Sequence, residues 1–334
     1  MVFLNHHAPY VPALHHPVLQ ALISQLFVGV VFFFVLSGFL IADRYYTVDR
    51  AQYCGYITRR FFRIFPLYAL ITVITFIVFA VLRDVPKQAL LLEFVANITF
   101  LRGWFEELWV TGVAQGWSLT VEMTFYALAP FLFACIRWRW WMLVLLPLGF
   151  LSLGVLLVVL CQGKAYLGFM DSFTFLFGIT FFGRCLEFFV GIAVALFLRS
   201  YGPNSMRFAT LAGGLLCMTS IGTAAYLGVD YDDVFGVLLH NVLLPISVGV
   251  FFWGLLTEQT LIRRLLSSTL VVFMGRTSYA FYLIHMGVVF TAAYTLTQDL
   301  LLTFIVLQGA AWLLYRTVEE PLAGLAQWRW NKAR

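Results

Sequence analysis

Long apolar segments, separated by short breaks, follow one another along almost the whole chain. Proline, glycine and charged residues mark the breaks, and each segment is close to the length that a bilayer requires. A transmembrane helix needs about 20 mostly apolar residues. The pattern therefore predicts an all-α, polytopic membrane helix bundle, with spans at 22–42, 64–82, 117–136, 140–161, 173–198, 208–227, 235–256, 270–294 and 300–318.

Two shorter apolar segments are not counted among these nine spans. Residues 89–101 are apolar but short, so we expect an interfacial or re-entrant helix there. The first residues, MVFLNHH, resemble the last turns of a span, so we expect about nine to ten transmembrane helices and a first helix that lacks its beginning. No soluble domain fits between or after the spans, and residues 1–334 are expected to form a single transmembrane domain.

The composition is that of a membrane protein. Hydrophobic residues make up 62% of the chain and charged residues 11%, against about 25% charged residues in soluble domains. The formal net charge of +5 is interpreted as a sign of membrane orientation, so the lipid bilayer is an expected partner and nucleic acid is not. The five cysteines are scattered without metal-ligand spacing, so no metal site is expected. The sequence carries no readable signal of oligomeric state.

The basic residues predict on which side of the membrane each loop lies. If the loop 43–63 is cytoplasmic and the spans alternate, fifteen of the 21 Lys and Arg residues face the cytoplasm. The positive-inside rule describes such a bias. We therefore expect a multi-pass protein of the cell (inner) membrane, with loop 43–63 and the C-terminus cytoplasmic and the His-rich N-terminal segment on the outer side. The basic residues then expected outside are Arg83, Lys87, Arg102 and Lys164.

Three arginines, Arg59, Arg60 and Arg63, lie in ITRRFFRIFPLY, directly before an apolar span. On a helix, Arg59 and Arg63 share a face and Arg60 lies about 100° away. Guanidinium groups present a planar fork of donors that suits phosphate. The patch can bind an anionic group or anchor the topology of the helix, and we expect it to do both.

Ionisable side chains inside spans are costly, which makes them candidates for function. Ser118, Glu122 and Tyr126 are spaced by four residues and so line one helix face. This polar stripe can orient a base or an acceptor hydroxyl, with Glu122 as a candidate catalytic residue. The alternative is a hydrogen bond between helices.

A second polar stripe is formed by Ser278, Tyr282 and His285, at positions i, i+4 and i+7 of one span. It indicates a wet or buried polar interior. His285 either contacts a substrate or joins two helices.

Two further features concern buried charge. Arg184 and Glu187 are three residues apart inside a span, and we expect them to pair with each other. His240 opens a span after an acidic loop and is expected at the membrane interface.

Four patches, in this order, carry a family resemblance: VGVVFFFVLSGFLIA (28–42), ITRRFFRIFPLY (57–68), GWSLTVEMTFYALAP (116–130) and MGRTSYAFYLIH (274–285). By their order and spacing they resemble the acyltransferase-3 family of integral membrane acyltransferases, which includes the O-antigen and exopolysaccharide O-acetylases. The resemblance covers nearly the whole chain.

This resemblance implies transfer of an acyl group, acetyl in the first place, from cytoplasmic acyl-CoA to a hydroxyl of a cell-envelope carbohydrate or glycolipid. It implies that Arg59, Arg60 and Arg63 bind the phosphates of acyl-CoA. His6 or His7 would act as catalytic base or as acyl carrier, and His6 is the better match to the family histidine. Family members carry a basic residue ten positions before that histidine, a place that lies upstream of this chain.

Other interpretations remain open at this stage. A multi-pass transporter or flippase for a sugar-linked substrate is the main alternative, although the sequence shows no inverted repeat and no paired broken helices. A catalytically inactive membrane scaffold is another. The tract HHAPYVPALHH can also be an exposed polar loop or an adventitious metal-binding segment.

Overall fold

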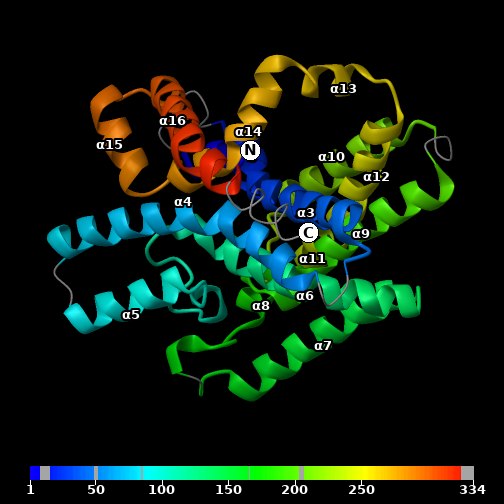
Figure 1. The fold of residues 1–334 in the computed structure, drawn as a ribbon, viewed down its shortest axis with the longest axis horizontal. Helices are drawn as coiled ribbons and strands as arrows, with labels where there is room; N and C mark the ends of the chain where they lie inside the picture. Colours follow the sequence, from blue (N-terminus) through cyan, green and yellow to red (C-terminus); the bar gives the residue numbers. More distant parts are fainter. Residues whose placement is uncertain (8–15, 49–51, 84–85, 165, 203–206, 325–334) are drawn as a thin grey trace. The chain divides into compact units, whose positions relative to one another are not determined.

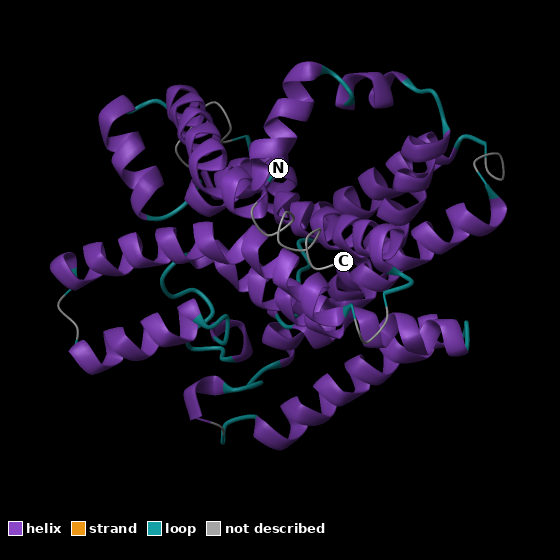
Figure 2. Ribbon diagram, in the orientation of Figure 1, coloured by secondary structure: helices purple, strands orange, loops and turns teal. Residues whose placement is uncertain are grey.

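The computed structural model describes residues 1–7, 16–48, 52–83, 86–164, 166–202 and 207–324. These residues form helices joined by loops, and no strand occurs among them (Figure 1, Figure 2). Eight of the described helices are long and apolar enough to cross a membrane, and a bent pair of helices brings the number to nine if it counts as one span. The predicted all-α membrane bundle is confirmed, and the chain is a multi-pass membrane protein.

The candidate spans include helices that continue through a local 3₁₀ or π turn. Short elements lie between or before them: α1 (Val2–His7), α5 (Lys87–Ile98), η4 (Arg102–Trp104), η6 (Tyr166–Gly168) and α13 (Leu261–Leu266). The spans are built from α2 (Pro17–Ser24), η3 (Gln25–Val28) and α3 (Gly29–Tyr45); α4 (Tyr53–Leu82); η5 (Ala114–Gly116) and α6 (Trp117–Trp138); α7 (Met142–Cys161); α8 (Phe173–Ile179) and α9 (Phe181–Tyr201); α10 (Ala209–Leu227); α11 (Val234–Val237), η7 (Leu238–Leu243) and α12 (Leu244–Thr257); α14 (Thr269–Ile284) and α15 (Val288–Thr297), which form the bent pair; and α16 (Leu300–Leu314) and η8 (Tyr315–Glu319).

Helix α4 begins earlier than its apolar run predicts. The span was predicted from residue 64, whereas the helix begins at Tyr53 and has 30 residues. At about 1.5 Å per residue it is longer than the roughly 30 Å hydrocarbon core, so it has turns to spare beyond the membrane. The arginine patch therefore lies inside a helix and not in a loop, because arginine lowers hydropathy without breaking a helix.

The predicted span 270–294 is not one straight helix. Helices α14 and α15 are bent by 98° relative to each other at a short break. Gly287 lies in this break with φ 72°, a left-handed value that favours glycine. The correction concerns the shape of the span and leaves its apolar character unchanged.

Contacts divide the chain into two compact units. Unit 1 comprises residues 1–47 and 127–267, and unit 2 comprises residues 48–126 and 268–334. Helix α6 contributes to both, because its residues up to Tyr126 belong to unit 2.

In unit 1, helices α3 and α9 pack backbone to backbone. A Cβ atom on Gly38 would lie 2.2 Å from the carbonyl oxygen of Phe188, and one on Gly191 would lie 2.0 Å from that of Val35. Helix α10 approaches α12 in the same way at Gly213. Small residues permit such contacts, and within a membrane they are a main source of helix association.

In unit 2, the loop between α5 and α6 is built around Arg102, which has no exposed surface. Its Nη1 donates to Oδ1 of Asn97 (2.9 Å) and to the carbonyl of Thr111, and its Nη2 donates to the carbonyls of Val113 and Ala114 (3.1 Å to Ala114). Burial lowers the pKa of Arg102, and these acceptors compensate for the lost hydration. Arg102 thus organises the loop. The sequence had predicted only that it is one of the basic residues on the outer side of the membrane.

Candidate functional site

The three arginines of α4 differ in how deeply they are buried. Arg60 is buried at 9% exposure, Arg59 is partly exposed and Arg63 is exposed. The helical geometry predicted for them holds, because all three lie within α4. One guanidinium is therefore directed into unit 2, while the other two remain within reach of a ligand at its surface.

Arg60 lies over Tyr126, a residue of the polar stripe on α6. Its guanidinium carbon lies 5.8 Å from the ring centroid of Tyr126, a cation–π distance. The Tyr126 hydroxyl donates to Oε1 of Glu122. Tyr126 is 6% and Glu122 is 3% exposed, so this arginine–phenol–carboxylate array lies in the protein interior.

Two further residues, Tyr279 and Glu319, lie near this array. Tyr279 of α14 donates its hydroxyl to the carbonyl of Ile64 (2.7 Å), and it interacts electrostatically with both Glu122 and Glu319. Glu319 is 7% exposed and close enough to Arg63 for their charges to interact. In the sequence, Glu319 lies directly after the predicted span 300–318, at the end of the helix that follows the fourth patch of the family resemblance.

The remaining stripe residue, Ser118, belongs to a second polar cluster in unit 2. Its Oγ lies 2.7 Å from the hydroxyl of Tyr282, which donates to the carbonyl of Gln115 (2.8 Å). In return, Nε2 of Gln115 donates to the carbonyls of Tyr282 (3.0 Å) and Leu283 (2.6 Å). Gln115, which had no periodic partner in the sequence, thus ties the start of α6 to the end of α14.

His285 follows α14 at the bend and is 1% exposed. Its Nδ1 lies 2.6 Å from the carbonyl of Tyr282, so Nδ1 carries the donated proton and Nε2 is the acceptor of the neutral ring. Ser278 does not join them: it is exposed, and its hydroxyl donates to the carbonyl of Gly275 in its own helix (2.8 Å). Of the second stripe, therefore, only Tyr282 and His285 lie together, at the end of α14.

The candidate catalytic histidines, His6 and His7, lie on α1 in unit 1, whereas the arginines and both stripes belong to unit 2. Helix α1 is fixed by Asn5, whose Nδ2 donates to the carbonyls of Ile23 (3.1 Å) and Ser24 (2.8 Å) at the end of α2. This anchor holds the short helix against η3, which it contacts.

The two histidines have different environments. His7 is 4% exposed, and its ring centroid is 4.8 Å from that of Phe3. His6 is exposed at the surface, and the partial burial of its ring, followed by the charge of His7, lowers the pKa of His6 below its ordinary value of 6.5. The imidazole of His6 is thus neutral at pH 7 and able to accept a proton.

Unit 1 also contains the expected ion pair. Nε of Arg184 lies 2.8 Å from Oε1 of Glu187, and their side chains are 1% and 0% exposed, so the predicted pairing is confirmed. Nη1 of Arg184 donates to the hydroxyl of Tyr231, whose ring centroid lies 5.4 Å from the guanidinium. Burial raises the pKa of Tyr231 to about 12, so its phenol stays neutral.

His240, predicted to lie at the membrane interface, is buried within unit 1 at 1% exposure. Its ring centroid lies 5.2 Å from that of Phe27 and 5.3 Å from that of Tyr231, while Phe27 and Tyr231 are 5.6 Å apart. Phe27 is part of η3, against which α1 packs. A continuous series of contacts, through the rings of Tyr231, His240 and Phe27, therefore links the Arg184–Glu187 ion pair to η3, the segment on which α1 packs.

These groups define what chemistry the chain can offer. Unit 2 supplies guanidinium groups in graded exposure beside a buried phenol–carboxylate pair. Unit 1 supplies an imidazole that is neutral at pH 7. Guanidinium groups suit phosphate, and a neutral imidazole suits proton removal from a hydroxyl. Among the described residues, no group of three or more His, Cys, Asp or Glu is placed to hold a metal ion.

Comparisons with known proteins give a consistent result. A family model described as an acyltransferase domain matches residues 1–315. Acyltransferase MdmB from Streptomyces mycarofaciens is 25% identical over 279 residues, which cover 78% of this chain and 68% of that protein. No solved structure matches the chain significantly.

Proposed function

The chain belongs to the acyltransferase-3 family of membrane acyltransferases, and from this premise we propose that it transfers an acyl group from acyl-CoA to a hydroxyl of a cell-envelope carbohydrate or glycolipid. Acetyl is the first acyl group to test. The observation that carries the proposal is the α4 arginine patch, with its buried Arg60 set against Tyr126 and Glu122, in a chain whose family match spans residues 1–315.

The arginine patch is the proposed site for the phosphates of the donor. Arg63 is exposed and Arg59 partly exposed, so their guanidinium forks can reach a solvent-borne phosphate. Arg60 has a different proposed role, because its stacking on Tyr126 directs it inward. We assign it, with Glu122, to fixing the helix pair beside the thioester end of the donor.

His6 is the proposed base, with His7 as the alternative. In direct transfer, the acceptor oxygen attacks the thioester carbonyl carbon while Nε2 or Nδ1 of the imidazole takes the hydroxyl proton. The C–S bond then breaks, and the CoA thiolate leaves and receives a proton from the imidazolium. The lowered pKa of His6 supports this role, since the ring is unprotonated when the acceptor arrives.

Acyl-histidine chemistry is the second proposed route. The imidazole nitrogen would attack the thioester carbonyl carbon, the C–S bond would break, and the CoA thiolate would leave and take up the ring N–H proton. The acceptor oxygen would then attack the carbonyl carbon of the acyl-imidazole, the acyl–N bond would break, and the hydroxyl proton would pass to the ring. Rapid quenching of the enzyme with labelled acetyl-CoA, without acceptor, separates the routes, because only this route leaves label on the protein.

The proposed location is the cell inner membrane, with α4's arginine end in the cytoplasm, where CoA is available, and α1 on the outer side. Support comes from the charge bias of the loops. The test is to replace His16 or Arg137 by cysteine and to treat intact cells with a thiol reagent that does not cross the membrane. We expect the cysteine at position 16 to be labelled and the cysteine at position 137 to be labelled only after the cells are opened.

Loss of transfer in His6→Ala is the central test. Purified protein is incubated with labelled acetyl-CoA and an envelope glycan fraction, and product is measured. We expect transfer to fall about 10²–10⁴-fold, the usual contribution of a general base, while CoA binding is kept. His16→Ala is the matched control, since His16 is exposed and makes no side-chain cap bond to α2.

The proposal fails if His6→Ala and His7→Ala both transfer at the wild-type rate. A purified wild-type protein that neither hydrolyses nor transfers acetyl from acetyl-CoA would refute the donor assignment. Mass spectrometry of envelope glycans with and without the gene identifies the acceptor, through a mass difference of one acyl group.

A further inference from the structure

Helix α13, the short helix with which unit 1 ends in the sequence, has an apolar surface that is left exposed. The exposed fraction is 44% for Ile262 and Leu266, 65% for Leu265 and 81% for Leu261, and no residue of the helix is buried. Exposed apolar residues that lie together mark a surface that contacts lipid or a partner.

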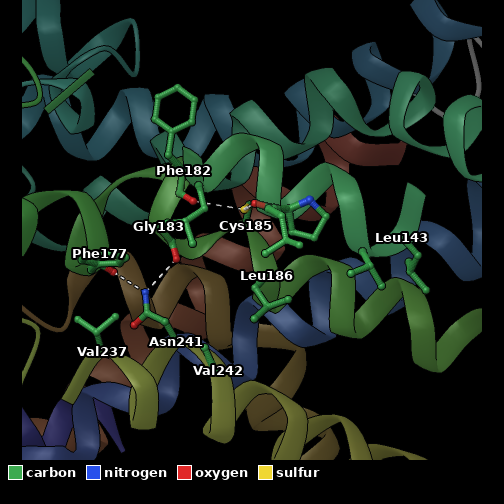
Figure 3. A pocket seen from close by; sticks show the side chains of 13 residues that line it. Leu143, Phe177, Phe182, Gly183, Cys185, Leu186, Val237, Asn241 and Val242 are labelled. Atoms are coloured by element: carbon green, nitrogen blue, oxygen red, sulfur yellow. Dashed lines mark hydrogen bonds between the residues drawn. The ribbon is translucent and has the colours of Figure 1, made fainter. Parts of the chain in front are cut away.

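The shortness of α13 does not by itself explain this exposure. Helix α8 is also short, with seven residues, and three of them are buried. Its residue Phe177 is joined to η7 by Asn241, whose Nδ2 donates to the carbonyls of Phe177 and Gly183, each at 2.9 Å (Figure 3). Unit 1 thus packs one short helix into its interior and leaves α13 at its surface.

The sequence of α13, LIRRLL, separates apolar from basic residues around the helix axis. At about 100° per residue, the four apolar residues fall within an arc of about 140°, and Arg263 and Arg264 lie outside that arc. An amphipathic helix with basic residues on its polar side lies in the plane of the membrane interface, with its apolar face among the first carbons of the acyl chains.

Hydrogen bonds at the start of α13 hold it by its polar side. Oγ1 of Thr260 accepts from the backbone amide of Arg263 (3.2 Å), and Nη1 of Arg263 donates to the carbonyl of Glu258 (3.2 Å), which follows α12. The carboxylate of Glu258 in turn accepts from the amides of Ala209 (2.6 Å) and Thr210 (3.2 Å) at the start of α10. Because Arg263 makes the side-chain bond, the apolar face of α13 is turned away from Glu258.

The connections on both sides keep α13 close to the membrane. Helix α12 belongs to a candidate span and α14 to the bent pair. Three residues separate α12 from α13, and two separate α13 from α14. Fully extended, such connections reach about 11 Å and about 7 Å. The headgroup region of one leaflet is roughly 5–8 Å thick, so α13 stays at the level of the headgroups.

The charge around α13 favours an anionic lipid. Glu258 is the sole acidic residue between Asp233 and Asp299 in the sequence, and its carboxylate already caps α10. Within the part of the chain that the structure describes, neither Arg263 nor Arg264 forms an ion pair, and Arg264 is exposed. The charge bias of the loops predicts both arginines on the cytoplasmic side, where anionic lipids attract basic segments next to a span.

We propose that α13 lies in the membrane interface and binds anionic phospholipid there. The guanidinium groups of Arg263 and Arg264 contact headgroup phosphates, and the apolar arc packs on the upper part of the acyl chains. The proposal is independent of acyl transfer, because it concerns lipid binding alone.

The test uses the full chain in nanodiscs that contain photoreactive phosphatidylglycerol or photoreactive phosphatidylcholine with the same acyl chains. Labelled peptides are located by mass spectrometry after irradiation. We expect residues 261–266 to receive about fivefold or more label from the anionic probe, the factor expected for one basic residue near an anionic surface. Equal labelling by the two probes overturns the anionic selectivity, and no label on these residues from either probe overturns the interfacial placement.

A double variant assigns the selectivity to the two arginines. Arg263→Gln/Arg264→Gln should lower labelling by phosphatidylglycerol to the level of phosphatidylcholine. The control Arg199→Gln/Arg316→Gln removes the same charge from arginines that already pair with Asp43 (3.8 Å) and Glu320 (2.6 Å), and it should keep the preference. An equal loss in both variants overturns the assignment. Thermal unfolding of each variant is measured alongside, and the two probes on the wild type decide the case if a variant does not fold.

A photoreactive amino acid at position 265 tests what covers the apolar arc. We expect it to cross-link to phospholipid of the nanodisc. Cross-links between two copies of the chain would identify a second copy as the occupant of this surface and would overturn the proposal.

Discussion

Arg184 in unit 1 and the arginine patch of α4 in unit 2 use the same side chain in contrasting ways. Arg184 is 1% exposed, paired with Glu187 at 2.8 Å and bonded to Tyr231. The arginines of α4 range from buried Arg60 to exposed Arg63. A guanidinium that is paired with a carboxylate in the interior holds the structure together, whereas arginines that range from buried to exposed keep positive charge available for a ligand.

This contrast predicts its largest effect at the ion pair. Arg184→Met leaves Glu187 buried without its partner, and we expect a loss of about 3–5 kcal/mol in unfolding free energy. Thermal unfolding in detergent measures it. The double variant Arg184→Met/Glu187→Leu should recover most of the loss, and Arg63→Met should lie within about 0.5 kcal/mol of wild type. Equal destabilisation by Arg184→Met and Arg63→Met would remove the distinction.

The arginine patch should show the reverse behaviour. Arg59→Ala and Arg63→Ala should each weaken CoA binding about tenfold or more, since a charged hydrogen bond contributes about 1.5–3 kcal/mol, with little change in stability. Isothermal titration gives the affinities, and the double variant should depend less on salt. Arg83→Ala is the control: it removes a basic residue at the other end of α4, where Arg83 pairs with Glu93 at 3.0 Å. Unchanged CoA affinity in the double variant would reduce the patch to a topology signal.

Tyr126 tests whether the buried part of the patch serves catalysis. Tyr126→Phe keeps the ring under Arg60 and removes the hydroxyl that donates to Glu122. We expect the rate of transfer to fall, because the activation free energy rises by about 1–3 kcal/mol, while the affinity for CoA is retained. Tyr126→Leu, which also removes the ring, should lose CoA affinity as well. Wild-type kinetics in Tyr126→Phe would leave Glu122 without a role in the reaction.

The smallest expected effect is a shift in the pH profile. The lowered pKa of His6 keeps its imidazole neutral to more acidic pH, so kcat/KM should fall only below pH 6.5 as the ring becomes protonated. His7→Asn removes one of the two causes and should move this fall upward, toward 6.5. The folded chain binds fewer protons at His6 than the unfolded chain in this range, so acid also destabilises the fold, and unfolding is measured at each pH. An acid limb at or above pH 6.5 in the wild type contradicts the assignment.

Much of the fold could be predicted because hydropathy in a membrane protein reflects a single dominant constraint. Each predicted span corresponds to a described helix or to the bent pair. The bend itself escaped, because a window of apolar residues does not detect the left-handed conformation of Gly287. The early start of α4 at Tyr53 also escaped, because charged turns end a hydropathy run without ending a helix.

The site was predictable where partners share a helix and unpredictable where they do not. The pairs Arg184–Glu187 and Glu122–Tyr126 follow from spacing, and both are present. Arg102 was predicted only as a basic residue on the outer side of the membrane, and its part in the loop was not predicted, because its acceptors are mainly backbone carbonyls, which have no sequence signature. The ring contacts of His240 could not be predicted for a similar reason: its neighbours come from distant segments.

The bend after α14 has a consequence for how this chain can vary. A broken helix leaves carbonyls that no later turn serves, and in lipid they must find donors inside the protein. Gln115 serves two of them, those of Tyr282 and Leu283. A substitution at Tyr282 or Leu283 does not remove its main-chain carbonyl oxygen. Mutation can therefore break these hydrogen bonds most directly at Gln115, the side chain that donates them. Glutamate fits the same space but lacks the amide protons, so at position 115 a change of one atom would matter more than a change of size.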